Sequence, residues 1–248
     1  MSESVSPERI APSARDFKIL TLQSSVFTRG DSAFKTSKVL GVLLEKFSEL
    51  LDGDPHTLPA MPAIQLPPEL PHVFLKSSNG KFNVNVGPTR IDVVQAFEES
   101  SLEMVKEFLT LAQRIHLRYL GQMSATPCRL AWVVTRTAEL SDPAKTLAGH
   151  FCKQSWIAGP LNRPSDFELH SLKRFMMNGT EVNSWMRCKT RPSVENASAA
   201  KAAIVVENDI NTLSETASTT KFDVQHIQPF FECAAIEADS IVRAYFPD

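Results

Sequence analysis

The chain has 248 residues, 43% of them hydrophobic and 22% charged, and its net charge is −2. A chain of this size and composition can bury a core of its own, as one large domain or two small ones, without a disulfide or a structural metal. Each half, divided after residue 124, carries 13 Lys and Arg and 14 Asp and Glu, so neither is basic and bulk attraction to nucleic acid or anionic membrane is not favoured.

The first half begins with a polar arm, residues 1–15, which we expect to be disordered. Over residues 16–124, hydrophobic periodicity predicts a strand, a helix, three strands and a long helix, at 17–27, 36–51, 72–77, 81–86, 89–95 and 98–120. Asn79-Gly80 predicts a hairpin between the first two of those three strands, and Gly121 is expected to end the long helix. Six prolines between residues 55 and 71 predict an extended surface connection.

The second half, residues 125–248, repeats that order. The predicted elements are a strand at 128–137, a helix at 142–152 with Asp142 as N-cap, strands at 166–176, 180–189 and 201–208, and a closing helix at 223–246. A second pair, Asn178-Gly179, lies 99 residues after the first and joins the corresponding strands. We therefore predict an α+β fold: an antiparallel sheet with helices packed on one face, built from a duplicated strand-helix-three strands-helix unit and packed as one compact body.

Several stretches carry a resemblance to known proteins: KFNVNVGPTRIDV, LAWVVTR, AIVVENDINTL, and the FF and YFP of the closing helix. Over residues 17–246 the chain resembles a sporadically distributed, functionally uncharacterised family of bacterial proteins of similar length. The shared features are strand and helix patterns, and the chain departs from them at 55–71 and 192–220. The resemblance implies a soluble bacterial protein with a mobile gene neighbourhood, and it implies no active site.

The cellular location is predicted from what the sequence lacks. The N-terminal segment has no apolar core of a secretory signal, and no apolar run approaches the ~20 residues that span a bilayer. The four cysteines lie 24, 36 and 45 residues apart, which fits no zinc or redox motif. We expect a cytoplasmic protein with reduced thiols, without a cofactor and without a metal.

Motifs that carry catalysis are missing as well. There is no G-x-S-x-G, no Walker loop, no G-x-G-x-x-G and no HExxH, and the six histidines are scattered. No catalytic residue is assigned, and an enzyme is left only as a site assembled from distant residues.

One candidate binding face is predicted at the second hairpin. An aromatic and three basic residues alternate along one strand, so their side chains share a face: Trp185, Arg187, Lys189 and Arg191. Such a face can stack and neutralise single-stranded nucleic acid, whereas in the structural alternative Trp185 packs under a helix and the cations fringe it. On the first long helix, Arg114 and Arg118 share a face that could contact an anion or simply be solvated.

The well-formed scaffold and the missing chemistry favour a non-enzymatic protein-interaction or scaffold module of a bacterial cytosolic system, such as an antitoxin-like, defence-associated or assembly partner. The expected partner is another protein or a second copy of the chain, as a homodimer, and not a membrane. The alternatives are a single-stranded nucleic-acid-binding protein that uses the 169–191 hairpin face, and the enzyme with an assembled site.

Overall fold

The computed structural model describes residues 12–30, 34–58, 67–99, 101–192 and 201–248. Its strands are β1 (Lys18–Thr28), β2 (His56–Thr57), β3 (Val73–Lys76), β4 (Phe82–Gly87), β5 (Arg90–Ala96), β6 (Pro127–Glu139), β7 (Glu168–Met177), β8 (Thr180–Arg191) and β9 (Ala203–Thr212). Its helices are α1 (Thr36–Phe47), α2 (Leu102–Met123), α3 (Pro143–Phe151), α4 (Gln154–Ile157) and α5 (Val224–Tyr245), with a short 3-10 helix at Ala14–Asp16. None of these helices is long and apolar enough to cross a bilayer.

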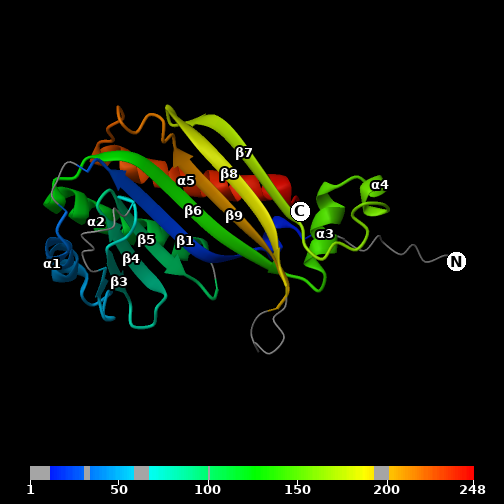
Figure 1. Cartoon of the computed structure of the whole chain (residues 1–248), viewed down its shortest axis with the longest axis horizontal. Helices are drawn as coiled ribbons and strands as arrows, with labels where there is room; N and C mark the ends of the chain where they lie inside the picture. Colours follow the sequence, from blue (N-terminus) through cyan, green and yellow to red (C-terminus); the bar gives the residue numbers. More distant parts are fainter. Residues whose placement is uncertain (1–11, 31–33, 59–66, 100, 193–200) are drawn as a thin grey trace.

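The nine strands form one antiparallel sheet in the order β2-β3-β4-β5-β1-β6-β9-β8-β7 (Figure 1). The predicted α+β class is therefore confirmed. The sheet is continuous between the two halves of the chain because β1 and β6 pair along most of their length, with Ser24 opposite Trp132. The strands that were predicted correspond to observed strands, with ends that differ by at most four residues.

Both predicted hairpins are present, and their turns differ in detail. Asn178 and Gly179 both have positive φ, 49° and 75°, which is the geometry of a two-residue type I′ turn between β7 and β8. In the turn between β3 and β4 only Gly80 has a positive φ, of 70°, and the Asn79 side chain accepts a hydrogen bond from the Lys81 N–H. Glycine suits both turns because it has no Cβ to clash at positive φ.

One face of the sheet, which we call the helix face, packs against the helices. Alternate strand residues point toward it, and the main core joins them to apolar residues of α1, α2 and α5, such as Leu43, Phe108 and Phe231. A second core cluster joins Leu147 of α3 to β8, β9 and α5. Figure 1 shows α2 and α5 on the same side of the sheet. We call the opposite side the open face.

The N-terminal arm differs from its prediction where it is described. Residues 1–11 of the predicted disordered arm lie outside the described residues. Next to them, the Ala14 N–H donates to the carbonyl of Phe246 at 2.8 Å, and the ring of Phe17 packs on Phe246 with centroids 4.7 Å apart. The chain is held from that point because a buried aromatic pair and a backbone bond tie it to the end of α5.

The ends of α2 also differ from their prediction. The helix begins at Leu102 because Ser101 is its N-cap and accepts a hydrogen bond from the Met104 N–H at 3.3 Å. It does not end at Gly121 but runs to Met123, and Ser124 closes it in the left-handed conformation. A glycine inside a helix costs stability without ending the helix, so its presence alone did not locate the end.

Candidate functional site

An open groove lies on the helix face, between α2 and α5 and above β1 and β6, with a volume of about 800 Å³. The two helices meet where the side-chain amide of Gln113 donates to Gln228 and the ring of His116 stacks on Phe231. The groove is lined by the first half of α2 and by α5 from Gln228 onward. We call it the α2–α5 groove.

Most of the lining of the α2–α5 groove is apolar. The apolar residues come from the segment before β1, from the two central strands and from both helices: Phe17, Ile19, Leu22, Leu102, Val105, Leu109, Trp132, Val134, Ala235 and Ile236. Leu102 and Ile236 are 74% and 73% exposed, so each helix holds a large apolar side chain in water beside the groove. Neighbouring exposed apolar residues of this kind are typical of ligand and protein contact sites.

A buried arginine lies in the floor of the groove. Arg136 of β6 is 5% exposed, and its Nη1 donates to the side-chain carbonyl of Asn208 at 2.9 Å. Its nearest carboxylate is Asp239 of α5, and the distance between Arg136 Nη2 and Asp239 Oδ1 is 4.0 Å, too long for a hydrogen bond. Burial lowers the pKa of Arg136 to about 10, so the guanidinium stays charged at neutral pH. The floor thus holds a cation whose charge is incompletely paired.

A second polar group in the floor has no partner. Trp132 of β6 is fully buried between Phe108 and Phe231, and its indole Nε1–H has no hydrogen-bond partner among the described residues. Buried polar groups are nearly always hydrogen-bonded in proteins, and the exceptions call for an explanation. The indole N–H is itself fully buried, so Arg136 is the polar group of the floor that an acceptor from outside the chain would contact.

The rest of the lining sets what the groove can do chemically. Its described charged residues are three cations, Lys106, Arg136 and Arg243, and two carboxylates, Glu232 and Asp239, and it includes no histidine or cysteine. Across the described part of the chain, no group of three or more His, Cys, Asp or Glu side chains is placed to hold a metal ion. The arrangement suits non-covalent binding of an apolar molecule that carries an acceptor or an anion.

The predicted binding face on β8 lies on the other side of the sheet. Trp185 pairs with Asp209 of β9, and Asp209 pairs with Val133 of β6, a neighbour of the core residue Trp132, so Trp185 points away from the helices. The structural alternative, with Trp185 under a helix, is therefore wrong. Lys189 and Arg191 keep the same parity on β8 and share this open face with Trp185.

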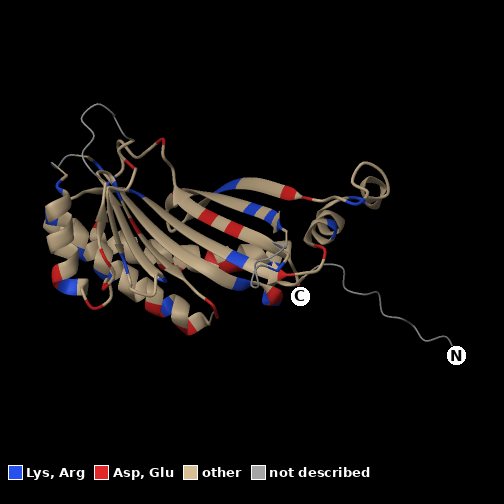
Figure 2. Cartoon of the chain, turned by 60° about the horizontal axis from the view of Figure 1, so that its bottom comes forward, with Lys and Arg blue, Asp and Glu red and all other residues tan. Residues whose placement is uncertain are grey.

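One of the cations of this open face, Arg187, is paired with acids. Arg187 lies over the ring of Trp185, with 5.2 Å between the guanidinium and the ring centroid, and forms an ion pair with Glu207 at 2.5 Å, while Asp209 is 3.8 Å away. Figure 2 shows blue and red segments interspersed along these strands. This pairing reduces the positive potential that Arg187 could offer to a phosphate backbone.

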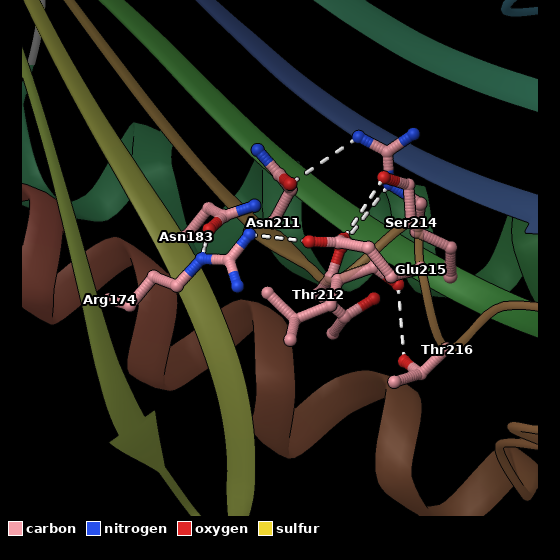
Figure 3. Close-up of polar contacts among 9 residues, drawn as sticks. Arg174, Asn183, Asn211, Thr212, Ser214, Glu215 and Thr216 are labelled. Carbon is pink, nitrogen blue, oxygen red and sulfur yellow. Dashed lines mark hydrogen bonds and ion pairs between the residues drawn. The ribbon is translucent and has the colours of Figure 1, made fainter.

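A polar cluster covers the neighbouring part of the open face (Figure 3). Arg174 of β7 donates to Asn183 of β8 at 2.9 Å and forms an ion pair with Glu215, which lies in the segment after β9. The Glu215 carboxylate also accepts a hydrogen bond from Ser214. These side chains satisfy one another across three segments, so the cluster holds the segment after β9 against the sheet.

Arg114 and Arg118 are not part of either surface. Both lie on α2, on the helix face. The Arg118 guanidinium donates to Glu45 of α1 at 2.6 Å, and the Arg114 guanidinium lies 5.9 Å from the ring of Phe47. Their contacts join α2 to α1 and do not bring them near Trp185.

Sequence reasoning did not identify the residues of the groove floor. A signal was present, because Arg136 has the same strand parity as Leu130, Trp132 and Val134 and therefore points into the core. An arginine at a core position of a strand is unusual unless it is paired or functional.

In comparisons with known proteins, no family model and no curated protein matches the chain.

Proposed function

We propose that this chain is a non-enzymatic binding protein and that the α2–α5 groove is its recognition site. The observation that carries the proposal is the floor of the groove, where a buried and incompletely paired guanidinium lies among apolar side chains that line a space of about 800 Å³. Ligand sites are typically of ~300–1,000 Å³, mainly apolar, with a few polar groups that fix orientation. The groove has each of these properties.

The role expected from the sequence, a scaffold or partner protein, is part of this proposal. A scaffold or partner protein of a bacterial cytosolic system, acting as a homodimer, needs a recognition surface and no catalytic group. Cys152, Cys188 and Cys233 are free thiols, in keeping with a reducing compartment. Membership of the sporadically distributed bacterial family that the sequence resembles is likewise a hypothesis.

We also propose that the chain is a duplicated unit. The support is the order of strands outward from the middle of the sheet, which is β1-β5-β4-β3 on one side and β6-β9-β8-β7 on the other. In both series the first strand of the unit is central, and the other three follow in reverse sequence order. On this view the groove is formed where the two units meet, since each contributes one central strand and one long helix.

The alternative functions have less support. Single-stranded nucleic acid would have to displace Glu207 from Arg187 on a face where acids and bases alternate. An enzyme would need an acid-base pair or a nucleophile beside the bound molecule. The described groove lining includes no histidine or cysteine, and its two carboxylates, Glu232 and Asp239, are exposed to water.

A fluorescence titration with N-phenyl-1-naphthylamine, a neutral apolar dye, tests the proposal. We expect saturable binding to the full chain, and we expect Ala235→Phe to weaken it by about tenfold or more because the added ring occupies the groove. Leu172→Gln is the matched control, since Leu172 is an apolar residue, 46% exposed, on the open face. Equal binding by the Ala235→Phe variant and the parent chain would refute the proposal.

A further inference from the structure

We propose that the α2–α5 groove takes an amphipathic monocarboxylate, with its carboxylate on Arg136 and its apolar chain along the floor over Val134 and Trp132. This inference rests on the proposed function, because it names the ligand class of that same site. It is carried by the charge, the shape and the burial of the groove.

Arg136 carries a positive charge in a buried position. A buried cation is costly unless an anion is hydrogen-bonded to it. Asn208 supplies a neutral acceptor, and Asp239 stands 4.0 Å away, while its other oxygen accepts from Arg243 at 2.9 Å. Asp239 is also 55% exposed, so its charge is shared with water and with a second arginine. A ligand carboxylate can give Arg136 the hydrogen-bonded anion that Asp239 does not.

The charged residues of the groove lining do not balance one another. The three cations and two carboxylates of the described lining leave the groove with a net charge of +1. One negative charge on the ligand balances that value. A phosphate monoester, with a charge near −2 at neutral pH, exceeds it, and it would also meet Asp239 and Glu232 at the mouth. The balance therefore favours a monoanion over a dianion.

The floor of the groove is apolar beyond Arg136, so it suits an apolar part of the ligand. Trp132 and Arg136 are four residues apart on β6, which separates them by about 13 Å along the strand, a distance that a chain of about ten carbons spans. Between them lies Val134, and the walls are the apolar side chains of Leu109 and Ala235. Each methylene that leaves water for this surface contributes roughly 0.8 kcal/mol in transfer experiments. A saturated or aromatic body of that length fits the floor, with its acid at the arginine end.

Isothermal titration calorimetry at pH 8 with decanoate and 1-decanol tests the inference on the full chain. The two probes share one chain length, so their difference reports the carboxylate. We expect decanoate to bind the parent protein roughly 10- to 100-fold more tightly than decanol, as a hydrogen bond to a charged group gives. Arg136→Met, which removes the guanidinium and keeps an unbranched apolar side chain, should remove most of that difference because it weakens decanoate far more than decanol.

A second variant should raise the affinity for decanoate, an effect that misfolding of the variant would not produce. Asp239→Asn removes the competing carboxylate at an exposed position, so decanoate should bind several-fold more tightly, with a much smaller change for the uncharged decanol. Equal affinity of the parent for decanoate and decanol, or no response of decanoate to either variant, would overturn the carboxylate assignment and leave the groove as a site. No binding of decanoate, decanol or the neutral dye would instead remove the proposed function itself.

Discussion

His116 of α2 is a second buried base in this molecule, and it is held in a different state from Arg136. Its ring is fully buried, and its Nε2 lies 2.9 Å from the hydroxyl of Ser24 on β1. Burial lowers the pKa of His116 from 6.5 to about 3, with the Ser24 bond opposing that shift. The imidazole is therefore neutral in the folded protein, whereas the guanidinium of Arg136 keeps its charge.

The lowered pKa of His116 predicts acid sensitivity. Between pH 6.5 and about 3 the unfolded chain binds a proton at this residue and the folded chain does not, so the free energy of unfolding should fall by about 1.4 kcal/mol per pH unit as the pH drops. His116→Gln should remove that part of the slope in urea unfolding measured from pH 7 to pH 5. His170→Gln, at a half-exposed residue, is the control, and equal slopes for all three proteins would contradict the buried neutral histidine.

At the residue scale, strand parity predicted more than motif searching. It placed Trp185, Arg187, Lys189 and Arg191 on one face, and their parity in β8 agrees. It did not predict that Glu207 of β9 pairs with Arg187, because the sequence of one strand does not determine its register with the next. For the same reason, the sequence did not predict that Asp239 of α5 lies near Arg136 of β6.

At the element scale, periodicity and turn residues located the long helices and eight of the nine strands. The two-residue β2 and the four-residue α4 were not predicted. β2 lies beside Pro55 and gains its strand character only by pairing with β3, and α4 has no buried residue to produce a periodic pattern. Such short elements follow from tertiary contacts, so a local pattern does not show them.

Two glycines give a matched test of the turns and helices. Gly179 has φ +75° in the β7–β8 turn, and an alanine there should destabilise the protein by about 1–2 kcal/mol because its Cβ disfavours that conformation. Gly121 lies inside α2 with open space around its Cβ direction, so Gly121→Ala should stabilise by about 0.5–1 kcal/mol. Thermal unfolding of both variants measures these changes, and destabilisation by Gly121→Ala would contradict the helix boundary at Met123.

At the scale of the whole molecule, the groove depends on how distant parts of the chain meet. Its floor needs β1 beside β6, and its walls need α2 and α5 to lie on the same face of the sheet. The sequence predicted the sheet and its helices, because each buries a clear apolar stripe. It did not predict the open space between the helices, since that space depends on where the two helices separate after the contact of Gln113 with Gln228.

The three tryptophans report three regions of the molecule: Trp132 the groove floor, Trp185 the open face and Trp156 the helix α4. The most direct test is therefore a nitrogen–proton NMR titration of the three indole groups, assigned with Trp→Phe variants, using the neutral dye and then decanoate. The Trp132 indole signal should move with both probes, while those of Trp156 and Trp185 stay in place. Movement of the Trp185 signal without that of Trp132 would contradict the groove as the recognition site and move recognition to the open face.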